Sequence, residues 1–312
     1  MNSSWFRTSP LLPAKKQFLE KKTIVITGAT SGIGRAMALL LGDAEAHLVL
    51  VGRNEREGER LARRISSNTQ NACARFYRTD LSCLAEVQKL ASQLKESYER
   101  IDILINNAGA RFSHFEETSD GIERTFATNH LGHFLLTALL LDRLLQAPAA
   151  RVITVGSSAH CGINGHPSWM LTRHNYERKL AYGTSKLANL VFAFELARRL
   201  SGTTVTSNAI DPGGVATNLG RNNGWIAWFR HLTYYAWKLQ LITARRAATH
   251  IIDLAQAEEF EGITGQYFHE RKVVSSSAAS RDLSTARELW SSSIALTGID
   301  SRIGRAWEYM QP

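Results

Sequence analysis

TIVITGATSGIG, running from Thr23 to Gly34, predicts a buried strand, a glycine-rich turn and the start of a helix. Backbone N–H groups at a helix N-terminus attract anions, and the pyrophosphate of a dinucleotide needs that arrangement. Gly28 permits the sharp turn, Gly32 removes a side chain that would block phosphates, and Gly34 lets the helix pack against the strand. The spacing is Gly-x-x-x-Gly-x-Gly and not the commoner Gly-x-Gly-x-x-Gly, so a tight loop without a ligand stays the alternative for this motif alone.

The composition favours one large domain. The chain has 312 residues, 44% of them hydrophobic, which is ample for a packed core. Its three cysteines form no C-x-x-C pair, so free thiols are expected and not a disulfide framework or a zinc site. Residues 1–20 have neither a signal-peptide pattern nor a membrane span, and predict an N-terminal arm before a domain over 21–312. A cytoplasmic location is expected, with contact to a membrane surface left open.

The net charge of +9 raises the question of an anionic partner. The Lys and Arg residues are spread along the chain without a recognised nucleic-acid motif. A solvated basic surface is therefore favoured over a nucleic-acid partner, and a basic balance also suits an anionic cofactor.

Strand and helix patterns alternate along the whole chain. Strands are expected at 23–26, 47–51, 74–78, 101–105, 151–155, 204–210 and 266–268. Helices are expected from 35 and 179 onward, at 55–66, 121–146 and 243–257, through 283–290, and from Ser82 as N-cap to about Glu99. This order predicts an α/β fold, a Rossmann-type doubly wound parallel sheet in a single domain.

The end of the second expected strand bears on cofactor choice. In dinucleotide sites an acid about twenty residues past the glycines binds the adenosine ribose, and this chain has Gly52 there, followed by Arg53. Because a guanidinium can pair with a 2′-phosphate, Arg53 favours NADP(H) over NAD(H). The alternative is a solvated Arg53, with Glu55 serving the ribose.

Polar and small residues follow the next strands. Asp80 can accept a hydrogen bond from an adenine amino group, or it can be a turn residue. The run Asn106-Asn107-Ala108-Gly109 leaves room for a cofactor at the end of its strand. His130 and His133 lie one turn apart on a helix, but no matching acid or cysteine accompanies them, so no metal site is expected.

Tyr182 and Lys186 lie one helical turn apart on the same face, a spacing that an ordinary amphipathic helix also has. A phenol has a reference pKa of about 10, so proton exchange at neutral pH requires a stabilised phenolate, which cationic Lys186 can provide. Ser157, after the fifth strand, can hydrogen-bond a substrate oxygen. Asn129, in an apolar helix, needs a partner and is expected to hold a water that links Lys186 to solvent. Together these residues predict hydride transfer between a nicotinamide and an alcohol or carbonyl.

In these motifs the chain resembles the short-chain dehydrogenase/reductase family throughout its length. The resemblance implies that Tyr182 is the catalytic acid/base, with Lys186, Ser157 and Asn129 as its partners. The cofactor-binding residues that it implies are Gly28, Ser31, Gly32, Ile33, Gly34, Arg53, Asp80, Leu81, Asn106, Ala108, Gly109, Tyr182, Lys186, Pro212, Gly213, Val215 and Thr217.

Within that family, segments 129–137 and 182–189 resemble the retinol dehydrogenase branch. Members of that branch typically prefer NADP(H) and act on retinoids, steroids or other lipophilic alcohols and aldehydes. The sequence departs from the branch in lacking a hydrophobic N-terminal anchor and in having Gly156 where many relatives have serine. These departures leave localisation and substrate open.

Two variable segments are expected to cover the substrate. One is 159–178, with Trp169 and Met170, and the other is a lid near 212–245. The lid has an apolar helical stripe formed by Trp225, Trp228, Phe229, Leu232 and Leu239. Closing it would exclude water from an apolar ligand, while contact with a membrane surface, core packing and a subunit interface are the alternatives.

The resulting hypothesis is an NADP(H)-dependent oxidoreductase that acts on a small lipophilic alcohol or carbonyl substrate, with homo-oligomerisation left open. One alternative is a reductase of a more polar carbonyl, which charged groups lining the pocket in place of Trp and Met would favour. The other is a catalytically silent NADP(H)-sensing interaction protein, since fold does not fix function.

Overall fold

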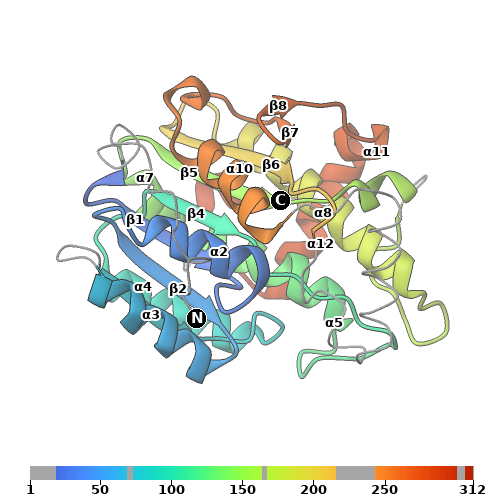
Figure 1. Cartoon of the computed structure of the whole chain (residues 1–312). Coiled ribbons are helices and arrows are strands. Elements are labelled where there is room, and N and C mark those ends of the chain that lie inside the picture. The colour runs from blue at the N-terminus through green and yellow to red at the C-terminus, as the bar shows by residue number, and fades with distance from the viewer. Residues whose placement is uncertain (1–18, 69–72, 164–166, 216–242, 301–305, 312) are drawn as a thin grey trace.

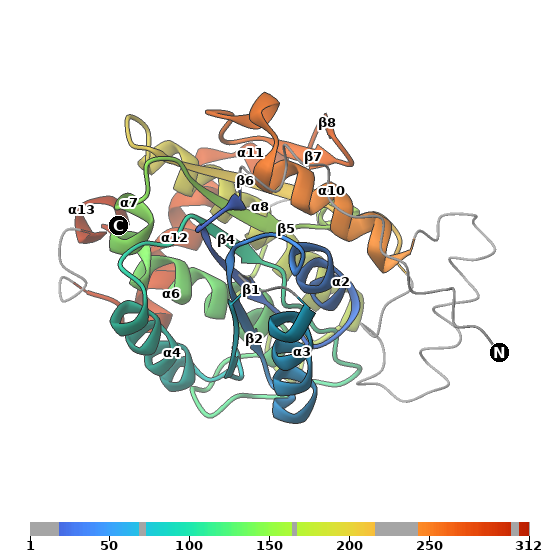
Figure 2. The ribbon, with the colours of Figure 1, turned by 60° about the vertical axis from the view of Figure 1, so that its left-hand side comes forward.

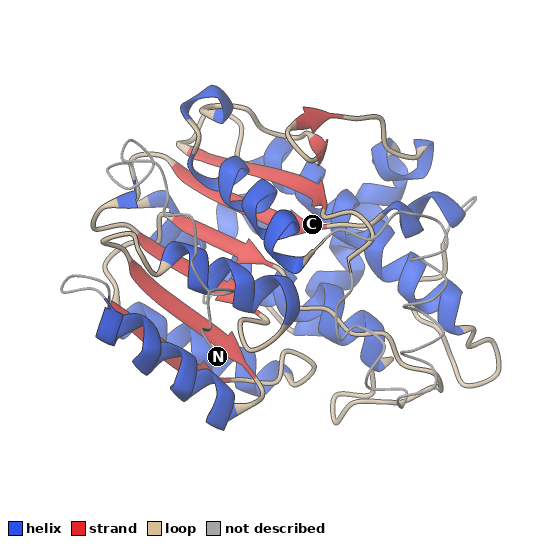
Figure 3. Cartoon of the chain, viewed as in Figure 1, coloured by secondary structure: helices blue, strands red, loops and turns tan. Residues whose placement is uncertain are grey.

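The computed structural model describes residues 19–68, 73–163, 167–215, 243–300 and 306–311. Within these residues eight strands form one sheet in the order β3-β2-β1-β4-β5-β6-β7-β8 (Figures 1 and 3), and the pairs are parallel except β7 with β8. The strands are β1 Thr23–Thr27, β2 His47–Gly52, β3 Cys73–Arg78, β4 Ile103–Asn106, β5 Ala150–Val155, β6 Val205–Asp211, β7 Tyr267–His269 and β8 Lys272–Val273. The predicted Rossmann-type doubly wound sheet in a single domain is confirmed, with β8 as an added edge strand.

Helices cover both faces of the sheet (Figure 2). They are α2 Gly32–Leu41, α3 Glu55–Asn68, α4 Leu84–Ser97, α5 Arg124–Phe126, α6 Gly132–Leu139, α7 Leu141–Leu145, α8 Arg178–Arg199, α10 Ala244–Gln256, α11 Ala278–Arg281, α12 Leu283–Thr297 and α13 Trp307–Met310. Along β1, Ile24 and Ile26 join the core beneath α2, α3 and α10, whereas Val25 joins the core beneath α4, α6, α8 and α12. Because both faces are buried, the strand reads as a continuous apolar run.

The expectation of one continuous helix over 121–146 is wrong. The structure has α5, a π-helical segment η2 (Ala127–Leu131), then α6 and α7. The Gly132 N–H donates to the Ala127 carbonyl, five residues earlier, which widens this turn. A Cβ at Gly132 would collide with the Leu81 carbonyl oxygen, so glycine is needed where α6 meets the loop after β3. Wide turns of this kind recur near functional sites.

The expectation that Ser82 is the N-cap of α4 is also wrong. Cys83 is the capping residue and makes no side-chain cap bond, whereas the Ser82 hydroxyl donates to Asp80 Oδ1 at 2.8 Å. The Leu84 N–H donates instead to Asp120 Oδ2, 36 residues away in the chain, at 3.1 Å. A tertiary contact therefore replaces the local cap.

Several expectations lie outside the described residues. They concern residues 1–18 of the expected arm over 1–20, the aromatic stripe of the lid, which falls within 216–242, and Thr217. Cys73, Cys83 and Cys161 are free thiols, as expected. None of the helices in the described ranges is long and apolar enough to cross a membrane.

Candidate active site

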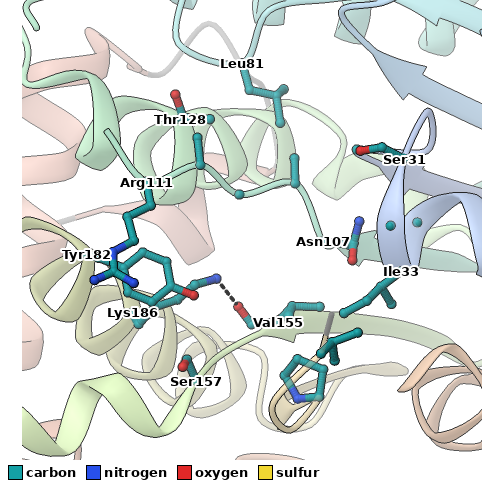
Figure 4. A pocket seen from close by; sticks show the side chains of 18 of the residues that line it. Ser31, Ile33, Leu81, Asn107, Arg111, Thr128, Val155, Ser157, Tyr182 and Lys186 are labelled. Carbon is teal, nitrogen blue, oxygen red and sulfur yellow. Dashed lines mark hydrogen bonds between the residues drawn. The ribbon is translucent and has the colours of Figure 1, made fainter. Parts of the chain in front are cut away.

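A cavity of about 1400 Å³ opens at the carboxyl edge of the sheet. It lies where the strand order reverses, because β2 and β3 lie on one side of β1 and β4 lies on the other. Ligands of open α/β sheets bind at such a point. The predicted site residues that line it are Gly28, Ser31, Gly32, Ile33, Gly34, Arg53, Asp80, Leu81, Ala108, Gly109, Ser157, Tyr182, Lys186, Pro212, Gly213 and Val215 (Figure 4). Asn106 and Asn129 do not line it.

The glycine turn forms one end of the cavity. Gly28 and Gly32 have φ of 69° and 52°, a left-handed backbone that other residues rarely adopt. A Cβ at Gly34 would collide with the Gly28 carbonyl oxygen, and one at Gly28 would lie 2.9 Å from Ala108 Cα. The first turn of α2 has no acidic residue, and its N-cap Ser31 lines the cavity. This compact turn fits a pyrophosphate against the helix N-terminus.

The Thr27 hydroxyl joins the ends of β1 and β4. Its oxygen accepts from the N–H groups of Asn107, at 2.9 Å, and Ala108, at 3.0 Å. The Asn107 amide donates back to the Thr27 carbonyl at 2.7 Å, and Asn107 lines the cavity. The Asn106 side chain is instead fully buried and donates to Thr137 Oγ1 at 3.1 Å, so the cofactor contact of Asn106 stays a prediction. The alternation of side chains along a strand separates these two amides.

Arg53 and Asp80 meet near the glycine end. Their side chains approach to 3.9 Å, and that of Arg53 remains half-exposed at 47%. Asp80 Oδ1 also accepts from the Ser82 N–H at 3.0 Å, which gives Asp80 the turn-holding role. Glu55, the alternative ribose ligand, is not among the cavity-lining residues, whereas Glu57 is.

Tyr182 and Lys186 project from α8 at the other end of the cavity, with the Tyr182 hydroxyl pointing inward and Ser157 on the neighbouring loop (Figure 4). The Lys186 ammonium lies 5.8 Å from the centroid of the Tyr182 ring and donates to the Val155 carbonyl at 2.8 Å. Burial lowers the pKa of Lys186 to about 8, and the negative charge of Asp211 opposes that shift. Lys186 is therefore mainly cationic at neutral pH.

Asn129 reaches this end through neighbouring groups. Its amide oxygen accepts from the Ala110 N–H at 2.7 Å, while its amide nitrogen donates to the Ala110 carbonyl at 3.0 Å and to Ser185 Oγ at 2.9 Å. Both amide protons are thus used to tie the loop after β4 to α8. The water-holding role of Asn129 stays a prediction.

His130 and His133 have separate protein partners. Burial lowers their pKa values to about 3 and 4, so both rings are neutral. His133 Nδ1 lies 2.9 Å from the Asn129 carbonyl, which requires the Nδ1 proton and leaves Nε2 to accept from the Thr27 hydroxyl at 2.9 Å. His130 Nε2 lies 2.9 Å from Ser293 Oγ. His133 thereby couples η2 to the end of β1, a link that sequence spacing alone does not reveal.

Asp211 is a site residue that sequence reasoning missed. Its Oδ2 accepts from the Ser158 N–H at 2.9 Å and from the Tyr267 hydroxyl at 3.3 Å, and its Oδ1 accepts from the Gly213 N–H at 2.9 Å. One carboxylate therefore holds together the loops after β5 and β6. The available signal was an acid at a strand end directly before Pro212-Gly213.

Gly156, the departure from the retinol dehydrogenase pattern, lies against α8. A Cβ at this position would lie 2.7 Å from Leu190 Cδ1, the end of a flexible side chain. The neighbouring Ser157 and Ser158 both line the cavity.

The wall next to Tyr182 differs from the expected apolar cover. Trp169 is buried and stacks on Phe126 at 6.4 Å between ring centroids, and Met170 packs against the same core. These two side chains do not line the cavity, although Ala159, Gly162, Ile163, Glu177 and Arg178 of the expected segment 159–178 do. The wall contains Arg111 instead, whose guanidinium carbon lies 5.6 Å from the Tyr182 ring centroid.

Comparisons with known proteins agree with this geometry. A family model described as short chain dehydrogenase matches residues 22–224. Retinol dehydrogenase 13 of Homo sapiens is 37% identical over 297 residues, covering 92% of this chain and 87% of the relative. A solved structure of a putative uncharacterized protein from Mycobacterium paratuberculosis matches with a TM-score of 0.69 at 30% identity, covering 91% of this chain and 97% of that one. The RhlG/NADP active-site complex of Pseudomonas aeruginosa has a TM-score of 0.65 at 26% identity, covering 83% and 97%.

Proposed function

The chain belongs to the short-chain dehydrogenase/reductase family, and from that premise we propose an NADP(H)-dependent enzyme that interconverts a lipophilic alcohol with its aldehyde or ketone. Family membership makes the protein an oxidoreductase acting on CH–OH and C=O groups. We add to this the preference for the 2′-phosphate of NADP(H) and the lipophilic substrate. The observation that carries it is that Tyr182, Lys186 and Ser157 line the same cavity as the glycine turn and Arg53.

A nicotinamide cofactor, when bound, supplies the hydride for reduction or takes it up in oxidation. The chain's own residues handle the proton. Tyr182 gives its phenolic proton to the carbonyl oxygen during reduction and takes a proton from the alcohol during oxidation. The Lys186 cation stabilises the phenolate that remains, and Ser157 donates a hydrogen bond to the substrate oxygen.

The glycine turn and Arg53 bind different parts of the cofactor. The N-terminus of α2 receives the pyrophosphate, because Gly28, Gly32 and Gly34 keep side chains away from it. Arg53, half-exposed on the cavity wall directly after β2, pairs with a 2′-phosphate. A solved relative described as an NADP complex supports this preference.

The substrate class is supported by the relatives. Several of them, at 34–38% identity, are named retinol dehydrogenases, and retinol is a lipophilic alcohol. One observation favours a second candidate, a reductase of a more polar carbonyl: Arg111, Glu177, Arg178 and Lys179 line the described wall near Tyr182.

A substrate panel tests the proposal. NADPH and NADH oxidation would be measured against all-trans-retinal, a ketosteroid, a medium-chain aldehyde and a polar ketone. We expect turnover of a lipophilic carbonyl with NADPH well above that with NADH. Turnover of the polar ketone alone would favour the second candidate, and tight NADPH binding with no turnover of any compound would favour the cofactor-sensing alternative.

A further inference from the structure

The charged residues that line the cavity fall into two groups. Arg53 and Asp80 come from the loops after β2 and β3, and Glu57 comes from the first turn of α3, near the glycine turn. Arg111 follows β4, and Glu177, Arg178 and Lys179 surround the start of α8, the helix that carries Tyr182. This second group contains three cations and one acid, so the described wall at the Tyr182 end is basic beyond Lys186.

Arg111 lies over the ring of Tyr182. It reaches from the loop after β4 to the ring of Tyr182, with its guanidinium carbon 5.6 Å from the ring centroid (Figure 4). Ser31 and Ile33, at the N-terminus of α2, lie on the opposite side of the cavity in the same view. An anion bound at Arg111 is therefore separate from a pyrophosphate held at the glycine turn.

The energetics of burial favour an anion here. An apolar ligand that covers a guanidinium removes its water without replacing the hydrogen bonds, which is costly. A carboxylate offers two oxygens that match the planar guanidinium fork in a charge-assisted pair. Arg178, half-buried, and Lys179, exposed, add positive potential on the same wall, and the exposed Glu177 offsets one charge.

We propose that Arg111 is a specificity residue that binds a carboxylate on the substrate, so that the enzyme acts on oxo acids or hydroxy acids with an apolar body. This inference rests on the proposed function and narrows its substrate class. It reconciles the lipophilic substrates of the relatives with the basic wall, because such a compound carries both an apolar chain and an anionic group. Hydride and proton transfer proceed as above, since the carboxylate takes no part in the bond changes.

A matched pair of substrates tests this inference. With NADPH as cofactor, kcat/KM would be measured for a medium-chain 4-oxo acid, whose carboxylate lies close to the reacting carbonyl, and for its methyl ester, which lacks the charge. We expect the acid to be preferred by about tenfold to a hundredfold, the scale of one hydrogen bond to a charged group. Arg111→Gln should bring the ratio of acid to ester close to one, and Arg111→Lys should keep part of it.

Arg173 provides the control variant. Its guanidinium also lies over an aromatic ring, that of Phe115 at 5.3 Å, but Arg173 does not line the cavity. Arg173→Gln should leave the ratio of acid to ester at the wild-type value. Thermal unfolding and NADPH affinity would be measured for each variant, so that a misfolded protein is recognised.

The outcomes separate this inference from the proposed function. A wild-type enzyme that turns over the ester as well as the acid, or an Arg111→Gln enzyme with an unchanged ratio, would overturn the role of Arg111 and leave the proposed function standing. Turnover of neither compound would count against the proposed function. Calorimetry on the NADPH-bound protein then decides the carboxylate site without turnover: a medium-chain fatty acid should bind at least tenfold more tightly than its primary amide, and equal affinities would contradict the inference.

Discussion

The two ends of the cavity are lined by different kinds of groups. At the glycine end, backbone groups and small residues shape the surface, and one hydroxyl, that of Thr27, fixes the loop after β4. At the Tyr182 end, long side chains from the loop after β4 (Arg111) and from α8 (Arg178, Lys179, Tyr182 and Lys186) line the cavity. A backbone cradle depends on a short local motif, whereas a wall of long side chains depends on tertiary packing. The glycine end therefore suits a ligand common to a family, and the Tyr182 end is where substrate choice can vary.

Tyr182→Phe should abolish proton transfer at the Tyr182 end without changing cofactor binding at the glycine end. The variant keeps the aromatic ring but loses the proton donor, so we expect kcat to fall by about 10²- to 10⁴-fold, the usual contribution of general acid–base catalysis. NADPH affinity, measured by fluorescence titration, should change little. A variant that retained most of its kcat would refute the proton-transfer role of Tyr182.

Arg53→Ala is the converse change at the glycine end. Loss of a charge-assisted hydrogen bond to the 2′-phosphate should weaken NADPH binding by about 1.5 to 3 kcal/mol and leave NADH binding nearly unchanged. The matched control is Glu55→Ala, which removes the alternative ribose ligand. If Arg53→Ala weakened both nucleotides equally, the 2′-phosphate role of Arg53 would be wrong. If Glu55→Ala selectively weakened NADH, Glu55 would be a ribose ligand.

Thr27→Val tests whether the glycine end is held as rigidly as its hydrogen bonds suggest. The valine leaves the partly buried N–H groups of Asn107 and Ala108 without their acceptor, and it leaves the buried His133 Nε2 without its donor. An unsatisfied buried group costs about 1–3 kcal/mol, so the free energy of unfolding in urea should fall by at least that amount. The control is Thr249→Val on the exposed face of α10, where a change within about 0.5 kcal/mol is expected. Equal losses in the two variants would argue against a special role for Thr27.

The same contrast explains how far the sequence could predict the molecule. The strand periodicities placed the parallel strands, and the glycine spacing and the Tyr-x-x-x-Lys spacing are local patterns that survive folding. Asn129 was recognised as a buried amide, but its actual partners, Ala110 and Ser185, come from separate segments.

The errors have a common physical origin in contacts between distant segments. The Asp120 cap of α4 and the π-helical turn beside Leu81 arise from packing that no local propensity encodes. Arg111 lies two residues past the recognised Asn106–Gly109 run, yet nothing in its sequence position shows that it lies over Tyr182.

Asp211→Asn has the smallest expected effect, because Asp211 does not line the cavity and influences the Tyr182 end through its charge. Lys186 has a pKa of about 8, lowered by burial and held up by Asp211, so it is cationic below that pH and neutral above it. For carbonyl reduction we expect kcat/KM of the wild type to fall as the pH rises through about 8, since the neutral amine no longer stabilises the phenolate. Asp211→Asn removes the charge that opposes desolvation, so the fall should begin at a lower pH.

Other groups near Asp211 and Lys186 do not account for that shift. His133, near Lys186, has a pKa of about 4, and burial and the Asp211 carboxylate raise the pKa of Tyr267, which keeps its hydroxyl protonated. Arg111, over Tyr182, stays cationic throughout this range. Asp142→Asn, which removes a carboxylate 3.2 Å from Lys95 on the far side of the fold, should leave the profile in place. Asp211→Asn could instead lower kcat/KM at every pH without shifting its pH dependence. That result would mean that Asp211 acts only by holding the loops after β5 and β6.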